Sequence, residues 1–403
     1  MNNCMKRIVL FICCAFTLFH FVSAQNEGIR FEKPEWKQVV RKASKEKKLI
    51  FVDCYTSWCG PCKELAKNIF PQKVVGDFYN RHFVSTKVDM DKDAMAAVLK
   101  KKFTPAAYPT LLFIDTQSGE IIHMVVGGGK AERILEVGRQ ALDRENNLAG
   151  LDRRYQAGER EAVFMKDYLK ALSAAYQKEK HEEVVTTYLA SLSEERLVTR
   201  ENWEIFKENI SDPLAPAFRR MMDNRKKVYQ IEDRAEVDNT LSRIIGNGIR
   251  SITEPSFYAL LSGKKVDETR NRELVEYLQR IDFEACPAAL AKLFTAEYAR
   301  KEDYKAMWNS IQIAYRYNVF RVTEDYLYIW KYIPVLAKET DDPEILQAAA
   351  ELMERLDVEG KPWYYRIALM NGRAVLLEKK GDKAGAEAAE ALAEKYREEE
   401  NKK

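Results

Sequence analysis

The amino-acid sequence predicts an α/β domain, with a central mixed sheet flanked by helices, followed by an all-α helical bundle or solenoid. In residues 28–146, apolar β-rich runs alternate with amphipathic segments of helical period, which is typical of an α/β domain. Beyond them, charged, alanine-rich amphipathic segments dominate. A chain of 403 residues, of which 46% are hydrophobic, is also too long to consist of this α/β domain alone. We therefore expect domains over 28–146 and 147–394, and a polar tail over 395–403.

The first domain is expected to open with a helix and a buried strand. A helical pattern covers residues 34–46, and the apolar run over 49–55 predicts a strand. An amphipathic helix over 59–70 follows and ends before Pro71. The later segments are predicted, in chain order, as a short helix over 77–81, a strand over 83–89, a helix over 93–102, strands over 111–114 and 121–126 joined as a hairpin, and a closing helix over 131–142.

Two cysteines lie where the buried strand leads into the next helix, in Trp58-Cys59-Gly60-Pro61-Cys62-Lys63. Unpaired backbone N–H groups and the positive end of the helix dipole stabilise a thiolate at such a position. We therefore expect Cys59 to be the nucleophile and Cys62, one turn further along, to be the resolving thiol. A zinc site is the alternative, but no second Cys-x-x-Cys or His-x-x-x-His follows at usable spacing. The pair is interpreted as a redox-active dithiol that needs no metal and no other cofactor.

These cysteines, with further residues of the first domain, resemble the thioredoxin superfamily. Asp53 lies six residues before Cys59, where the family places a buried acid that accepts and returns the proton of the second cysteine. Lys87 falls where the family usually has a lysine facing that acid, and Tyr108-Pro109-Thr110 matches the family's loop with a cis proline against the disulfide. The resemblance covers about residues 28–146 and implies a thioredoxin fold, with Asp53 and Lys87 as catalytic residues beside the cysteines. It is strongest to exported thioredoxin-like reductase domains, on the segments over 45–52 and 70–75.

Large aromatic residues flank the cysteines and the proline loop. Trp58 and Tyr108 could cap the domain core, but their places beside Cys59 and Pro109 favour a shallow apolar rim for a substrate polypeptide. Gly127 opens a run of three glycines that lacks the other residues of a phosphate-binding loop. In the resembling family, a glycine here keeps the surface open for a substrate chain. The residues expected to bind substrate are Trp58, Gly60, Pro61, Tyr108, Pro109 and Gly127.

Two further cysteines and two histidines of the expected domains are interpreted as structural. Cys54 follows Asp53 on the same strand and so points to the opposite face, where a small buried hydrophobic residue is expected rather than a third redox thiol. Cys286 stands before a proline near a helix start and is also expected to be structural. His82 and His123 are not placed as in a Cys-His nucleophile arrangement.

The N-terminus has the pattern of an export signal. Lys6 and Arg7 precede an apolar run over 8–22, and small residues stand before Gln25. The run is shorter than the about 20 residues that span a bilayer, although retention as an anchor is the alternative. We expect residues 1–24 to act as the signal peptide and the mature protein to be soluble, periplasmic if the source is a Gram-negative bacterium and otherwise secreted.

The C-terminal half is expected to be a stacked array of helices. Residues 364–393 resemble one tetratricopeptide-type unit, with a weaker echo over 302–314. The spacing between the two segments is not a multiple of that repeat, which favours an irregular bundle or solenoid. Some aromatic residues could line a peptide groove, although aromatics at helical spacing more often fill a core: Tyr326, Tyr328, Trp330, Tyr332 and Trp363.

Together these features predict an exported thiol-disulfide oxidoreductase that reduces disulfides in protein substrates. Gly-Pro between the cysteines resembles the reducing members of the family, and a reductant in an oxidising compartment implies a membrane electron donor. The net charge of +3, from 65 basic and 62 acidic residues, gives no excess that would attract nucleic acid. The helical half is expected to dock a partner or substrate. Two alternatives stay open: a non-catalytic scaffold protein that works through the helical half, and a disulfide oxidase or isomerase.

Overall fold

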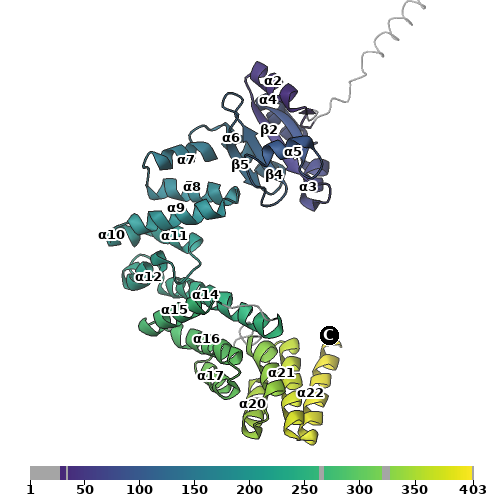
Figure 1. Ribbon diagram of the computed structural model, residues 1–403, viewed down its shortest axis with the longest axis vertical. Helices are drawn as coiled ribbons and strands as arrows, with labels where there is room; N and C mark the ends of the chain where they lie inside the picture. Colours follow the sequence, from purple (N-terminus) through teal and green to yellow (C-terminus); the bar gives the residue numbers. More distant parts are fainter. Residues whose placement is uncertain (1–27, 33–34, 263–266, 320–326, 402–403) are drawn as a thin grey trace, which may run out of the picture. The chain divides into compact units, whose positions relative to one another are not determined.

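The computed structural model describes residues 28–32, 35–262, 267–319 and 327–401 (Figure 1). The expected signal peptide, residues 1–24, lies outside the described residues. The chain divides into two compact units between Ser191 and Leu192. Each unit buries a hydrophobic core of its own.

The first unit is built on a five-stranded mixed sheet with the strand order β1-β3-β2-β4-β5. The central strand β2 (Leu49–Tyr55) pairs in parallel with β3 (Phe83–Asp89) and antiparallel with β4 (Thr110–Ile114). At the edges, β1 (Phe31–Glu32) runs parallel to β3, and β5 (Ile121–Val126) runs antiparallel to β4. The predicted α/β class and central mixed sheet are confirmed.

Helices flank this sheet in nearly the predicted order (Figure 1). The predicted helix over 59–70 is interrupted at Leu65, where the N–H of Phe70 reaches back five residues to the Leu65 carbonyl at 2.9 Å. The sequence prediction missed β1, because a strand of two residues carries no alternating pattern. The helices are α2 (Trp36–Glu46), α3 (Gly60–Glu64), the π-helical turn η2 (Leu65–Ile69), α4 (Lys73–His82), α5 (Ala94–Leu99) and α6 (Ala131–Leu142).

An aromatic core fixes the central strand from one face of the sheet. The Phe51 ring of β2 lies 4.8 Å from Tyr79 of α4 and 5.2 Å from Phe113 of β4, between ring centroids. All three side chains are buried, and the Tyr79 hydroxyl donates to the carbonyl of Ile134 in α6 at 2.7 Å. Such a close-packed core holds the backbone of β2 rigidly. The strand therefore presents its C-terminal end, where the cysteines follow, from a fixed position.

Three further helices belong to the first compact unit, namely α7 (Leu148–Gln156), α8 (Ala162–Ala174) and α9 (Lys178–Ser191). Asn147 caps α7 by accepting from the N–H of Gly150 at 2.8 Å. The N–H of Leu148 donates to Nδ1 of the buried His123 in β5 at 3.2 Å, so a side chain of the sheet satisfies one of the unpaired amides of α7. The division between the two units lies at the end of α9. The domain limit expected at residue 146 was placed at a change in composition, and it stays a prediction.

Every element described in the second unit is helical, which confirms the predicted class of the C-terminal half. Its core gathers side chains such as Met307, Tyr332, Leu336 and Met353. The elements are α10 (Glu194–Leu197), α11 (Arg200–Asn209), α12 (Pro216–Asp223), α13 (Arg225–Val228), α14 (Arg234–Ser262), α15 (Glu268–Arg280), α16 (Cys286–Arg300), α17 (Tyr304–Arg316), the π-helix η3 (Leu327–Tyr332), α19 (Ile333–Glu339), α20 (Pro343–Leu356), α21 (Trp363–Lys380) and α22 (Lys383–Asn401).

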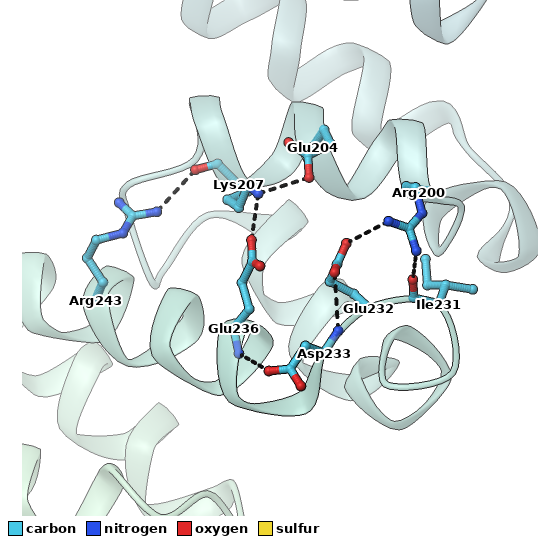
Figure 2. A network of polar contacts seen from close by, with 8 residues as sticks. All are labelled: Arg200, Glu204, Lys207, Ile231, Glu232, Asp233, Glu236 and Arg243. Carbon is cyan, nitrogen blue, oxygen red and sulfur yellow. Dashed lines mark hydrogen bonds and ion pairs between the residues drawn. The ribbon is translucent and has the colours of Figure 1, made fainter.

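A network of charged side chains joins α11 to the start of α14 (Figure 2). The ammonium of Lys207 donates to Glu204 at 2.9 Å and to Glu236 at 2.7 Å, and the carbonyl of Lys207 accepts from Arg243 at 3.1 Å. The two carboxylates raise the pKa of Lys207 above its usual value. One lysine thus bridges two helices through both its side chain and its backbone.

The aromatic residues singled out in the helical half separate into two groups. Tyr328 and Tyr332 are buried in the core, whereas Trp330 and Trp363 are about half exposed. Tyr326 lies outside the described residues. Trp330 lines a shallow apolar groove of about 200 Å³ together with residues of α19 and α21. Among the described helices, none contains an apolar stretch of the length needed to cross a membrane.

Candidate active site

The two cysteines lie at the junction of β2 and α3 and form a disulfide, with their sulfurs 2.02 Å apart. Cys59 is the N-cap of α3, and its Sγ accepts from the backbone N–H of Cys62 at 3.1 Å. Pro61 stands in the first turn, where its missing N–H leaves no hydrogen bond unmade. A main-chain amide therefore points at the sulfur of Cys59, which is an arrangement that stabilises negative charge there.

Exposure is concentrated beside the sulfurs and not on them. Cys59 and Cys62 are each 4% exposed, whereas Trp58 is 68% exposed. Open space surrounds the α-carbon of Gly60 on its side-chain side. Exposure therefore does not distinguish the attacking thiol from the resolving one, and the order rests on the position of Cys59 at the helix start.

Asp53 and Lys87 occupy paired positions on β2 and β3, with Lys87 Nζ 3.8 Å from Asp53 Oδ2. The Asp53 side chain is 3% exposed, and its Oδ1 has no hydrogen-bond partner within the described part of the chain. Burial raises the pKa of Asp53 to about 6, against the opposing charge of Lys87. Burial likewise lowers the pKa of Lys87, against the charge of Asp53. Asp53 can therefore exchange a proton near neutral pH.

The aromatic rim and the proline loop meet beside the disulfide helix. The rings of Trp58 and Tyr108 make an edge-to-face contact with centroids 6.1 Å apart, and the Trp58 indole donates to Asp91 at 2.9 Å. The Tyr108–Pro109 bond is cis, and the Pro109 carbonyl accepts from the N–H of Gly127 at 2.7 Å. Gly127 has φ of 95°, which favours glycine, and a Cβ there would meet open space.

Sequence reasoning missed three residues that contact the expected site residues. Asp91 accepts a hydrogen bond from the Trp58 indole and stands two residues after the end of β3, so the end of this strand was an available signal. Phe31 and Phe70 lie against the ammonium of Lys87. No sequence signal pointed to these two, because one stands in the unrecognised strand β1 and the other looked like an ordinary helix-end core residue.

The other cysteines lie in environments that disfavour a thiolate. Burial raises the pKa of Cys54 well above its usual value and that of Cys286 to about 11. His123 is also buried, which lowers its pKa to about 4 and keeps the imidazole neutral at physiological pH. Among the described residues, no group of three or more Cys, His, Asp or Glu side chains is arranged to hold a metal ion.

Comparison with known proteins identifies the domain that carries this site. The Thioredoxin family profile matches residues 28–139. Thioredoxin H3 of Arabidopsis thaliana is 34% identical over 116 residues, which are 28% of this chain and 89% of that protein. The chain belongs to the thioredoxin family. Like its relatives, this thioredoxin-family protein is a thiol-disulfide oxidoreductase that works through a cysteine pair.

Other relatives of this thioredoxin-family chain are similar over the same region. The thiol:disulfide interchange protein DsbD of Pseudoalteromonas atlantica is 33% identical over 88 residues, which are 22% of this chain and 15% of that protein. A candidate disulphide-isomerase from Bacteroides thetaiotaomicron, known from a solution structure, is 43% identical and is covered to 98%, which corresponds to 30% of this chain, with a TM-score of 0.27.

Proposed function

We propose that this protein is an exported reductase of disulfides in protein substrates, with Cys59 as nucleophile and Cys62 as resolving thiol. The observation that carries the proposal is the disulfide at the start of α3, with the Cys62 amide directed at the Cys59 sulfur. The same amide would stabilise the thiolate of Cys59 after reduction. Family membership supports the chemistry, and the resemblance to exported reductase domains supports the compartment.

The cycle begins with the reduced protein. The Cys59 thiolate attacks one sulfur of a substrate disulfide, which forms a mixed disulfide and releases the other substrate sulfur as a thiolate. Cys62 then loses its proton and attacks the Cys59 sulfur, which releases the second substrate thiolate and closes the Cys59–Cys62 disulfide. Two electrons pass from the protein dithiol to the substrate, and the substrate thiolates take up protons.

Asp53 is the group proposed to move the proton of Cys62. Its buried carboxyl, with a pKa raised to about 6, is a stronger base than an ordinary aspartate at neutral pH. Lys87 stands 3.8 Å away and limits that rise, so that a useful fraction of Asp53 stays ionised. Asp53 would thus accept a proton from Cys62 during resolution and return it when the disulfide is reduced again.

The exposed surface around the disulfide is proposed to receive an extended polypeptide. Trp58 and Tyr108 supply an apolar edge, and Gly60 and Gly127 leave room for a main chain to approach. Pro61 and Pro109 complete the surface proposed for substrate.

We further propose a membrane electron donor for this reductase. Cys-Gly-Pro-Cys resembles reducing members of the family such as thioredoxin, whose potential is about −270 mV, against about −120 mV for a strong oxidant. A reductant in an oxidising compartment must be re-reduced from elsewhere. The export pattern over residues 1–24 and the similarity to thiol:disulfide interchange proteins support this placement, in the periplasm if the source is Gram-negative. The helical half is proposed to dock a partner or substrate.

Replacing the proposed nucleophile tests the assignment. We expect Cys59→Ser to abolish reduction of insulin disulfides by the protein with dithiothreitol as electron source, because Cys62 alone cannot form the intramolecular disulfide and burial raises the pKa of Cys54 and Cys286. Cys286→Ala is the matched control, since it removes a buried thiol far along the chain and should retain full activity. Equal activity of Cys59→Ser and wild type would refute the catalytic assignment and favour the scaffold alternative.

Trapping and potentiometry address the substrate and the direction of exchange. Cys62→Ser should accumulate mixed disulfides between Cys59 and substrate proteins, because the resolving thiol is gone. Equilibration of the wild-type pair in glutathione buffers should give a potential in the range of the reducing members. A potential near that of the strong oxidants would instead support the oxidase or isomerase alternative.

A further inference from the structure

Two phenyl rings enclose the ammonium group of Lys87. Its Nζ lies 4.3 Å from the centroid of the Phe31 ring and 5.0 Å from that of the Phe70 ring. The two rings are tilted by 59° with centroids 5.4 Å apart. Phe31 belongs to β1 and Phe70 follows η2, so two segments distant in sequence meet at one lysine of β3. We call Phe31 and Phe70 the phenyl cage.

The phenyl cage has a physical effect on where the lysine charge resides. An ammonium on a flexible four-carbon stem is strongly hydrated, and the Lys87 side chain is 29% exposed, so water is within its reach. Aromatic ring faces attract a cation and replace part of its lost hydration. The cage therefore favours the position in which Nζ stands 3.8 Å from the Asp53 carboxylate.

We propose that Phe31 and Phe70 are positioning residues for the proton transfer: by holding Lys87 against Asp53, they set the pH at which Asp53 accepts the proton of Cys62. The role of Asp53 in this statement rests on the proposed function. The position of Lys87 is what the cage controls, because Asp53 is fixed in the central strand while the lysine stem can move.

The charges around this pair leave Lys87 as the group that acts on Asp53. The electrostatic influence on Asp53 comes from Lys87, and the influence on Lys87 comes from Asp53. On β1, Glu32 is engaged in an ion pair with Lys42 of α2 at 2.5 Å. The other titratable side chains on the C-terminal stretch of β2 and on α3 are Cys54, Tyr55, Cys62, Lys63 and Glu64, with Cys59 as the cap of α3 and Asp89 at the end of β3. Cys54 and Tyr55 are neutral at physiological pH, with pKa values raised first by burial.

Phe31→Leu is the decisive substitution, because it removes one ring face and keeps most of the apolar volume. Phe31 is only partly buried, whereas Phe70 is a core residue whose loss would disturb packing. We expect the Asp53 carboxyl to titrate about 0.5 to 1 pH unit higher in this variant, since the lysine charge moves away from it. Phe31→Tyr retains a ring face and should restore the wild-type midpoint. The carbon-13 chemical shift of the Asp53 carboxyl, followed over pH in the oxidised protein, measures the midpoint directly.

Two further variants separate positioning from general destabilisation. Phe78→Leu removes another partly buried ring that packs on the same core, and it should leave the Asp53 midpoint unchanged. Lys87→Met should raise the midpoint, and adding Phe31→Leu to it should cause no further shift, because the cage acts through the lysine. An unshifted midpoint in Phe31→Leu, or the same shift with and without Lys87, would overturn the proposal.

The same measurement is independent of turnover. If wild-type protein left insulin disulfides intact, the proposed function would fail, while the Asp53 midpoints would still decide whether the cage controls the pair. If wild-type protein is active, the pH profile of mixed-disulfide resolution should move upward with the Asp53 midpoint in Phe31→Leu. A profile that stays fixed while the midpoint moves would contradict the link to Cys62.

Discussion

Asp53 is an ionisable group placed where water is largely excluded, and this placement affects the stability of the fold. The native structure disfavours the ionised carboxyl, since its pKa is raised from 3.8 to about 6 by burial. The unfolded chain ionises the same group at the lower value. The free energy of unfolding therefore falls as pH rises from about 4 to about 6, and the loss is complete at higher pH.

Asp53→Asn should consequently stabilise the oxidised protein at neutral pH. A shift of about two pH units corresponds to about 3 kcal/mol, which we expect as the increase in the free energy of unfolding of the first unit at pH 7 to 8. The increase should nearly vanish at about pH 2 to 3, below both pKa values, where the wild-type carboxyl is protonated in the folded and the unfolded state. Urea unfolding at the two pH values provides the measurement. A variant equally stabilised at both would show that charge burial is not the cause.

At the scale of single residues, the sequence predicted which residues form the candidate site but not which other residues contact them. The spacing of Cys59 and Cys62 and the strand before them predicted the disulfide helix, because both are local. The contacts of Phe31 and Phe70 with Lys87 join residues far apart in the chain and depend on the strand order, which no local pattern contains.

Among the elements, the helix that carries the cysteines is short and changes its hydrogen-bond pattern at Leu65. The sequence predicted one continuous helix over 59–70, because its amphipathic pattern continues across the change. A single π-type hydrogen bond, from the N–H of one residue to the carbonyl five residues earlier, is a backbone feature that leaves no pattern in the side chains. The strands β2 and β3 were predicted at their observed bounds, because each is a long apolar run with a clear beginning and end in the sequence.

The junction of α11 and α14 offers a test of a charged network as a stabilising element. Lys207→Met should lower the free energy of unfolding of the second unit by about 1 to 2 kcal/mol, because Glu204 and Glu236 lose their shared partner. The raised pKa of Lys207 means that this contribution is fully present at neutral pH and is lost only above the usual lysine range. Urea midpoints at pH 7 measure the change.

Lys227→Met is the matched control for that experiment. Lys227 makes an ion pair with Glu194 at 2.9 Å in which both side chains are more than half exposed. Such surface pairs contribute about 0.5 kcal/mol or less. Equal losses in the two variants would mean that two carboxylate partners and partial burial give Lys207 no advantage over a single exposed pair.

At the scale of the whole molecule, two hydrophobic cores predict two separable unfolding transitions. Phe113→Ala creates a cavity in the first core, and Leu336→Ala creates one in the second. Each should destabilise its own unit by about 2 to 5 kcal/mol and lower only the corresponding calorimetric transition. If either substitution moved both transitions together, the chain would unfold as one cooperative body.

The sequence predicted the class of both parts of the chain, because composition and hydrophobic period change near residue 146. It could not reveal that α7 to α9 pack into the first unit. Which core a helix joins depends on contacts such as that between His123 and Leu148, whose partners are 25 residues apart. The composition of a segment predicts its secondary structure, but it does not predict which other elements the segment packs against.

The bond from Leu148 to His123 has a practical consequence for anyone dissecting the molecule. A fragment cut after residue 146 would strip the covering from an imidazole that the intact chain keeps dry, and would let it gain a proton in mildly acidic solution. Spectra or redox titrations recorded on such a fragment would then contain a response foreign to the full-length protein. A fragment that continues to Ser191 avoids this artefact.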